Sequence, residues 1–236
     1  MPTCSVCRNT VAAWKPHPHL DQRSEFMKLM ETVGSDLAVY QCPACGCTDR
    51  DRHLWLYLNA IGLPASMRGA RLLHLAPERH LEALFEACGP SEYIKGDLFP
   101  SRPNQVKVNA EQLQFDNGQF DMIVCNHVLE HVDSPEKVLS EFYRCLKPKG
   151  LLIAQTPYSP LLRRSFQLKE FPGKELATLL YGQADHVRLF ADDIVGLFQA
   201  AGFQGDLLAH ATLLPGVDAM EAGINAREPL FIFTKP

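Results

Sequence analysis

Two pairs of cysteines near the start of the chain have the spacing of a metal site. Two residues separate Cys4 from Cys7, and two separate Cys42 from Cys45. Each C-x-x-C turn can present two thiolates to one ion, so the two turns together can complete a tetrahedral zinc site. Because four thiolates leave no open position on the metal, we expect these residues to bind a structural zinc ion. Cys47 is an alternative to Cys45 as the fourth ligand.

Two histidines farther along the chain could accept a proton during catalysis. His127 belongs to the segment N-H-V-L-E-H, and His186 directly follows Asp185, whose carboxylate could orient the ring. An unperturbed imidazole titrates near pH ~6.5 and can therefore take up a proton at neutral pH. His127 and His186 are accordingly the two candidates for a general base.

The elements that must position these residues alternate between strand and helix from residue 71 onward. Apolar runs predict strands at 71–76, 92–97, 105–109, 121–125, 151–155, 203–211 and 229–234. Apolar residues at helical spacing predict helices at 51–61, 81–88, 134–146 and 192–201. This alternation indicates an α/β fold with a largely parallel sheet and helices on both faces.

One connection is too short for a regular α/β unit. Residues 98–104 alone separate the second predicted strand from the third. A crossover between parallel strands usually takes a dozen or more residues and contains a helix. We therefore expect either a crossover without a helix here or strand boundaries that differ from those predicted.

Residues 108–157 resemble the central block of class I methyltransferases, which use S-adenosylmethionine. The matching parts occur in the same order: a polar turn, F-D-x-I-V in the fourth strand, N-H-V-L-E-H, and a helix ending in L-K-P-x-G. With the flanking strands the resemblance covers roughly residues 70–236. It implies a Rossmann-like sheet that is mostly parallel, with an antiparallel last strand, and S-adenosylmethionine as cofactor.

The resemblance also implies which residues bind that cofactor. In such folds the ligand lies across the carboxyl ends of the strands, where the strand order reverses. Asp97 ends the second strand, next to Leu98, and its carboxylate would accept hydrogen bonds from both ribose hydroxyls. The other implied residues follow the first, third and fourth strands: His74, Ala76, Glu78 and Arg79; Asn109, Ala110 and Glu111; Cys125 and Asn126.

The turn after the first strand departs from the usual glycine-rich pattern. Its sequence is H-L-A-P-E-R-H, with no glycine between Gly69 and Gly89. Here Ala76 would allow close approach of the ligand, Glu78 would pair with the cofactor ammonium group and Arg79 with its carboxylate. This turn, behind an N-terminal cysteine cluster, is similar to that of a bacterial subgroup of the family. The alternative is a degenerate site in a non-catalytic binding module.

Length and composition indicate one large domain with a small appendage. We expect a zinc-binding module at 1–48, a connecting helix and linker at 49–68, and the methyltransferase domain at 69–236. The net charge of −4 gives no general attraction to nucleic acid or acidic membranes. Without a long apolar run or an export signal, the sequence predicts a cytoplasmic protein with no membrane span.

The expected reaction is methyl transfer to an oxygen, nitrogen or sulfur atom of a small molecule. Residues 157–190 and 212–226 are rich in proline, leucine and aromatic residues, and could cover such a substrate. The alternative substrate is RNA or protein, with the zinc module docking the polymer. Residues 1–60 contain equal numbers of basic and acidic residues and so lack the basic footprint of a nucleic-acid binder.

Overall fold

A seven-stranded sheet runs through the centre of the molecule in the computed structural model, which describes residues 1–20 and 23–236. Its strand order is β3-β2-β1-β4-β5-β7-β6. The strands are β1 (Arg71–Leu75), β2 (Glu92–Asp97), β3 (Val106–Lys107), β4 (Phe120–Cys125), β5 (Leu146–Ile153), β6 (Gln204–Leu208) and β7 (Leu230–Thr234). Neighbours from β3 to β5 are parallel, whereas β7 is antiparallel to both β5 and β6. The predicted mostly parallel sheet with an antiparallel last strand is confirmed.

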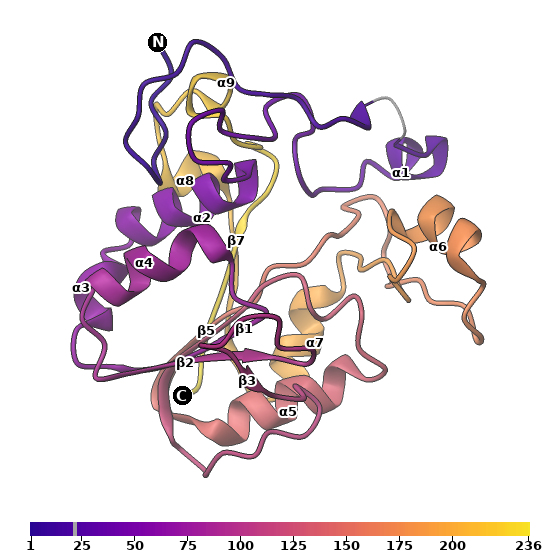
Figure 1. Ribbon diagram of the computed structural model, residues 1–236. Helices are drawn as coiled ribbons and strands as arrows, with labels where there is room; N and C mark the ends of the chain where they lie inside the picture. The colour runs from indigo at the N-terminus through magenta and orange to yellow at the C-terminus, as the bar shows by residue number, and fades with distance from the viewer. Residues whose placement is uncertain (21–22) are drawn as a thin grey trace.

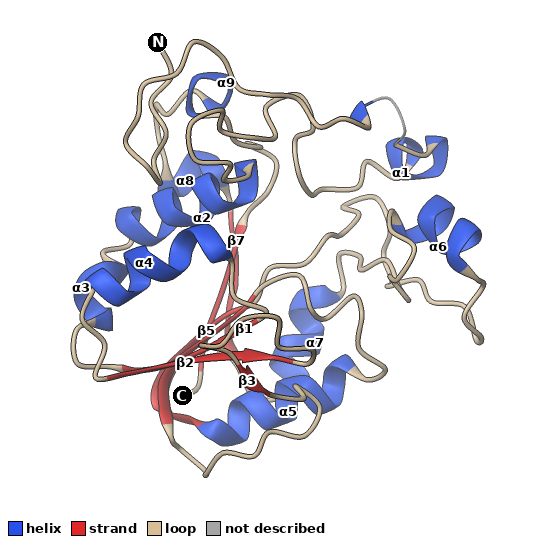
Figure 2. Ribbon diagram, viewed as in Figure 1, coloured by secondary structure: helices blue, strands red, loops and turns tan. Residues whose placement is uncertain are grey.

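Helices cover both faces of this sheet (Figures 1 and 2). They are α1 (Glu25–Leu29), α2 (Asp49–Ala60), α3 (Leu63–Met67), α4 (Arg79–Ala87), α5 (Pro135–Cys145), α6 (Lys174–Tyr181), α7 (Ile194–Ala200), α8 (His210–Leu213) and α9 (Ala219–Ala222). Helices α2, α3 and α4 pack on one face, and α5 and α7 on the other. Among the described helices, none is long and apolar enough to cross a membrane.

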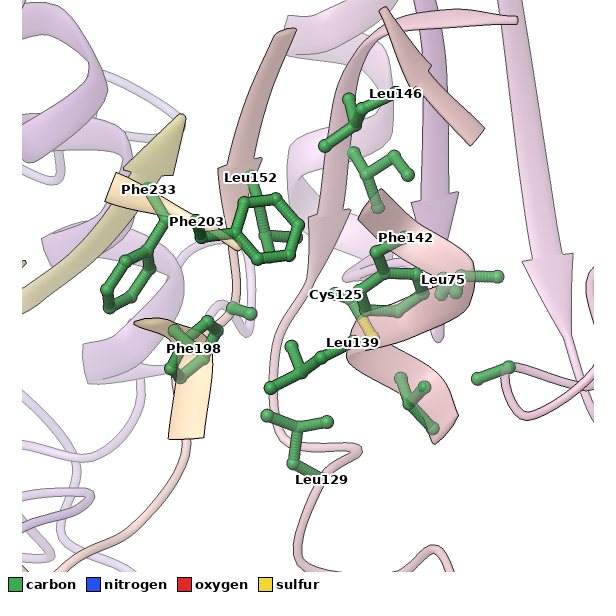
Figure 3. Packing of buried hydrophobic residues seen from close by; sticks show 14 of the residues in the cluster. Leu75, Cys125, Leu129, Leu139, Phe142, Leu146, Leu152, Phe198, Phe203 and Phe233 are labelled. Carbon is green, nitrogen blue, oxygen red and sulfur yellow. The ribbon is translucent and has the colours of Figure 1, made fainter. Parts of the chain in front are cut away.

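Alternate residues of the central strands supply the two apolar cores. Leu72 and Met122 face the cluster around α2 and α4, whereas their neighbours Leu73 and Ile123 face α5 and α7. This alternation follows from the two-residue period of a strand, and both faces are apolar because both are covered by helices. Figure 3 shows the second cluster, where Phe142 of α5 packs among the strand residues.

The short connection after β2 contains no helix. Residues 98–105 turn back directly into β3, where Gly96 pairs with Val106 and Asp97 with Lys107. The side-chain oxygen of Gln105 accepts hydrogen bonds from the backbone N–H groups of Ser101 and Arg102, which closes the turn locally. Of the two expected explanations, the crossover without a helix is therefore the one observed.

The start of α2 joins the N-terminal segment to the sheet domain. Thr48 caps the helix, with reciprocal hydrogen bonds between its side chain and backbone and those of Asp51. Such a capping box satisfies two backbone donors that have no partner within the helix. The helix thus begins immediately after Cys47, which fixes the cysteine cluster at its amino end.

The segment 212–226, predicted as a possible cover for the substrate, packs on the N-terminal module instead. The indole Nε1–H of Trp14 donates to the carbonyl oxygen of Met220 at 3.1 Å, and the Arg52 guanidinium lies 4.1 Å from the centre of the Trp14 ring. Arg52 Nε donates to the carbonyl oxygen of Gly223 at 2.9 Å. In Figure 1, α8 and α9 accordingly lie next to the N-terminal segment.

A further apolar cluster, apart from the two cores of the sheet, joins α1 to the segment between β5 and α7. Met27 of α1 is buried with Ala177 and Tyr181 of α6 and with Leu189. Figure 1 shows these two helices side by side, away from the sheet. The two segments therefore pack together as one unit. We call this unit, which comprises residues 23–34 and 157–190, the α1–α6 cap.

Candidate active site

A cavity of about 660 Å³ opens at the carboxyl ends of β1 and β2, next to the point where the strand order reverses. Ligands of open α/β sheets bind at this place because the loops diverge there. The predicted residues that line the cavity are Ala76, Asp97, Leu98, Asn109, Ala110, Glu111 and His127. The structure thus brings together residues from four separate strand ends, as the resemblance implied.

Asparagine and aspartate side chains fold back onto their own loops at the cavity rim. Asp97 Oδ1 accepts a hydrogen bond from the N–H of Phe99 at 2.8 Å, and Asn109 Oδ1 accepts one from the N–H of Glu111 at 2.9 Å. Glu111 Oε1 in turn accepts from the N–H of Ser134, at the start of α5. These contacts hold the loops still, and Asp97 Oδ2 keeps its capacity to accept hydrogen bonds from a ligand.

Two residues at the cavity have backbone angles that side-chain-bearing residues rarely adopt. Ala76 follows β1 with φ +47°, and His127 follows β4 with φ +56°. Each is held by a backbone hydrogen bond, from Ala76 N–H to the Gly96 carbonyl and from His127 N–H to the Gln155 carbonyl. Such conformations cost free energy and concentrate at functional sites.

Three predicted residues form a polar network behind the cavity. Glu78 accepts a hydrogen bond from Asn126 Nδ2 at 2.9 Å and contacts His74 Nε2 at 2.5 Å. Burial opposes ionisation of Glu78, but the His74 imidazole, the Asn126 amide and a backbone N–H together outweigh it and lower the carboxyl pKa. His74 and Asn126 are buried, as is Cys125, and these residues do not line the cavity. Their contact with a cofactor, like that of the exposed Arg79, stays a prediction.

Several cavity residues were missed by the sequence analysis, among them Gly96 and Phe99. Gly96 lies in β2, where a Cβ atom would come within 2.7 Å of Leu75 and 2.9 Å of Val108. Phe99 lines the cavity and is 79% exposed, unusual for a large apolar side chain. Both residues lie close to Asp97 in the sequence, which was the available signal. For Gly96 there was a second signal, because a glycine within a strand often marks close approach of another group.

Glu130, also missed, joins the two candidate bases. Its Oε1 atom lies 3.6 Å from His127 Nδ1 and 4.0 Å from His186 Nε2, although 59 positions separate His127 from His186 in the numbering (186 − 127). Burial opposes its ionisation, but His127 and two further imidazoles outweigh burial and lower the Glu130 pKa to about 2. Burial also lowers the pKa of His186. The signal in the sequence was an acidic residue between two histidines in N-H-V-L-E-H.

Arg188 holds the loop that carries these residues. Its guanidinium is 4% exposed and donates to the backbone carbonyl oxygens of Leu129, Val132 and Asp133. The planar fork of arginine suits several acceptors at once. Arg188 is thus a positioning residue for the loop from His127 to Asp133.

A second cavity, of about 500 Å³, lies between the N-terminal segment and α6. His17, Arg23, Tyr40 and Arg50 line it from one side, and His186 from the other. His131 lines the first cavity, and its ring lies 4.6 Å from the ring of His186. A wall of a few side chains therefore separates the two cavities.

Five cysteines converge in the N-terminal segment. The sulfur atoms of Cys4, Cys42, Cys45 and Cys47 all lie within 4.8 Å of one another, and Cys7 Sγ lies 4.0 Å from Cys42 Sγ. The Cys47 thiol, together with backbone N–H groups, lowers the pKa of Cys4 to about 4 against the effect of burial. Asn9 Nδ2 donates to Cys7 Sγ at 3.4 Å. These clustered sulfur atoms fit the tetrahedral thiolate shell of zinc. The sequence analysis gave Cys47 as an alternative to Cys45, but the four sulfur atoms that lie together include both and leave out Cys7, so Cys47 competes with Cys7 for one position.

The fold and the first cavity place the chain among class I methyltransferases. The parallel centre, the antiparallel β7 and the cavity at the switch point are those of their Rossmann-like fold. A family described as methyltransferase domains matches residues 53–208, which is more than half of the chain. The protein belongs to this methyltransferase domain family.

Individual relatives match only part of their own length. Demethylmenaquinone methyltransferase from Clavibacter sepedonicus is 29% identical over 133 residues, or 51% of this chain and 54% of that protein. The ubiquinone/menaquinone biosynthesis C-methyltransferase UbiE from Vibrio vulnificus is 30% identical over 135 residues, or 50% of each. This chain spans about half the length of these relatives.

A solved structure agrees with the fold. The S-adenosylmethionine-dependent methyltransferase from Mesorhizobium loti superimposes with a TM-score of 0.50 at 15% identity, covering 76% of this chain and 95% of that chain.

Proposed function

We propose that the protein transfers a methyl group from S-adenosylmethionine to a small molecule. The observation that carries this proposal is the 660 Å³ cavity at the sheet switch point, into which four strand ends bring their residues. When bound, S-adenosylmethionine supplies a methyl group already activated by its sulfonium. The protein then has to align the acceptor, exclude water and accept a proton where the acceptor loses one.

Asp97 is the residue that would bind the ribose. It ends β2 at the cavity rim, and one of its carboxylate oxygens is engaged by its own loop. The exposed ring of Phe99 and the side chain of Leu98 would cover the adenine. His127 also lines this cavity, and its buried Nδ1 lies 3.6 Å from Glu130 Oε1. His127 would accept the proton, with His186 as the second candidate.

The 500 Å³ cavity would receive the acceptor. Its volume falls in the range of about 300–1,000 Å³ typical of small-molecule sites. It lies between the N-terminal segment and the α1–α6 cap. The names of the matched relatives refer to quinones, which are small molecules. RNA or protein as substrate stays the alternative, and the atom that accepts the methyl group is open.

The experiment is calorimetric titration with S-adenosylhomocysteine, the product form of the cofactor. The wild-type chain should bind one equivalent, and Asp97→Ala should weaken binding about 10- to 100-fold, the value of hydrogen bonds to a charged group. Asp206→Ala, an exposed aspartate on β6, is the matched control and should bind as wild type does. Absence of binding by the folded wild-type chain would favour the non-catalytic alternative.

For the cysteine cluster we propose one structural zinc ion. Cys4, Cys7, Cys42 and Cys45 are the predicted ligands, and Cys47 is the competing fifth thiol. With four thiolates the ion would have no open position, so it would stabilise residues 1–48 and take no part in methyl transfer.

A further inference from the structure

Three buried side-chain atoms face one another at the wall between the two cavities. They are His127 Nδ1, Glu130 Oε1 and His186 Nε2, and none has a hydrogen-bond partner among the residues that the structure describes. Glu130 is 1% exposed and His186 is 2% exposed. Unsatisfied buried polar atoms cost about 1–3 kcal/mol each, so three of them in one place require an explanation.

The hydrogen bonds on the other side of each group determine what these atoms can bind. His186 Nδ1 lies 2.8 Å from the carbonyl oxygen of Tyr181, which can only accept, so Nδ1 carries the proton. In the neutral ring Nε2 then presents a lone pair toward Glu130. Glu130 Oε2 accepts from the hydroxyl of Thr156 at 2.9 Å, which leaves Oε1 with its lone pairs in the same space. The lone pairs of His186 Nε2 and Glu130 Oε1 lie 4.0 Å apart, and a cation between them would satisfy both.

His131 offers a third possible metal ligand on the same wall. Glu130, His131 and His186 each offer one atom, and these atoms all lie within 4.8 Å of one another. The His131 ring is held by the carbonyl oxygen of Asp185, 3.2 Å from its Nδ1. Imidazoles oriented by a backbone carbonyl are the usual arrangement around a bound metal.

We propose that Glu130, His131 and His186 form a second metal site, for a divalent first-row transition-metal ion. Two imidazoles and one carboxylate on one side of an ion leave coordination positions free on the other. His131 lines the cofactor cavity and His186 lines the acceptor cavity. The free coordination positions would therefore lie close to both the cofactor and the methyl acceptor.

The role of the ion rests on the function proposed above. A bound divalent ion would hold an oxygen atom of the acceptor and lower the pKa of a hydroxyl group there. His127, whose Nδ1 lies 3.6 Å from the same Glu130 oxygen, would stand beside that hydroxyl as the proton acceptor. The site therefore favours an oxygen nucleophile that needs deprotonation.

The test is a Co²⁺ titration of the zinc-loaded protein, followed by visible absorption. The wild-type chain should bind one equivalent with d–d bands but without the intense thiolate-to-cobalt band that binding at the cysteine cluster would give. Glu130→Gln and His186→Gln should weaken Co²⁺ binding at least about 10- to 100-fold, since even second-shell changes have effects of that size. Glu175→Gln, an exposed carboxylate on α6, should bind as wild type does.

Two results would overturn the proposal. One is the absence of stoichiometric Co²⁺ binding by the wild-type chain, and the other is Co²⁺ binding by Glu130→Gln and His186→Gln that is as tight as that of wild type. The wild-type titration decides by itself if either variant fails to fold. Titration of the same samples with S-adenosylhomocysteine separates the two proposals. Absence of Co²⁺ binding by the wild-type chain that still binds S-adenosylhomocysteine refutes only the metal site. Co²⁺ binding by a wild-type chain that does not bind S-adenosylhomocysteine refutes only the methyltransferase proposal.

Discussion

Ala76 occupies a left-handed backbone conformation that favours glycine. At φ +47° its methyl group crowds the backbone, yet it is small enough to leave the cavity open beside β1. A left-handed conformation costs an L-residue roughly 1–2 kcal/mol, which the hydrogen bond to Gly96 helps to offset. The strand-one turn is thus strained at the place where the cofactor would approach.

Substitutions of Ala76 should reveal this strain. Ala76→Gly should change the free energy of unfolding by no more than about 1 kcal/mol, because relief of strain opposes the larger chain entropy of glycine. Ala76→Val should destabilise by about 2 kcal/mol, because β-branched residues tolerate positive φ least. Urea unfolding of both variants measures the difference, and equal stability of the two would show that residue 76 is not strained.

Arg188 allows a second prediction at this scale. Arg188→Lys should lower the free energy of unfolding by about 2 kcal/mol, because one ammonium group cannot serve all three carbonyl oxygens that the guanidinium contacts. Urea unfolding measures the loss. Arg163→Lys, at an exposed arginine, is the control and should be neutral within about 0.5 kcal/mol. A neutral Arg188→Lys would mean that water or other donors satisfy these carbonyls.

Among the elements, α5 fixes the loop that leads from β3 to β4. Glu141 accepts a hydrogen bond from the N–H of Leu113 at 2.7 Å and pairs with Arg144, which donates to the carbonyl oxygens of Leu113 and Phe115. One turn of the helix thereby holds residues 113–115, which follow directly on the cavity residues Asn109 to Glu111. The helix positions one side of the cavity through this clamp.

The clamp should weaken in acid. Arg144 lowers the pKa of Glu141 despite partial burial, with help from the Leu113 N–H. A carboxyl group with a lowered pKa stabilises the fold above its unfolded value of about 4.3, and this contribution is lost as the pH falls through the folded value. Glu141→Gln should therefore be about 1 kcal/mol less stable than wild type at pH 7, with a smaller difference near pH 3.

Urea unfolding at several pH values would measure this difference. Glu175→Gln, which removes an exposed carboxylate, should show no such change with pH. A difference between wild type and Glu141→Gln that stays constant from pH 7 to pH 3 would contradict the assignment.

For the whole molecule, the cysteine module is anchored at two distant points of the chain. Trp14 and Arg52 contact residues 220–223, and Val33 pairs with Tyr158 near the end of β5. Adding a Cβ at Gly223 would bring it within 2.3 Å of the Trp14 ring. Residues of the module such as His17 and Tyr40 also line the 500 Å³ cavity. Folding of the module should therefore be coupled to that of the sheet domain.

Zinc removal tests this coupling. The purified chain should contain one zinc per molecule, and Cys4→Ser and Cys42→Ser should lose it, because both residues belong to either possible ligand set. Cys88→Ser, at a cysteine that follows α4 and is not part of the cluster, should keep it. Metal analysis measures the content, and zinc loss should also lower the melting temperature. Comparison of Cys7→Ser with Cys47→Ser identifies the fourth ligand.

The local sequence determined the elements of the central sheet and the residues at their ends. Ser134 caps α5 at the start of the helix predicted for 134–146, and the apolar runs of β1, β4 and β7 lie where expected, because capping and strand periodicity act over a few residues. The helix and strand around 146–150 were less well predicted. The L-K-P-x-G segment ends the helix at Cys145 and already belongs to β5, since pairing with β4 stabilises it as a strand.

Only the tertiary structure decided which of these residues meet. Glu130 and His186 lie 56 positions apart in the numbering (186 − 130), and nothing in the local pattern of either residue indicates the other. Packing of the α1–α6 cap brings them within 4.0 Å, and the same packing forms one side of the 500 Å³ cavity. Short-range preferences fix where strands and helices form, but contacts between distant segments depend on how apolar surfaces are buried together, which no single stretch of sequence contains.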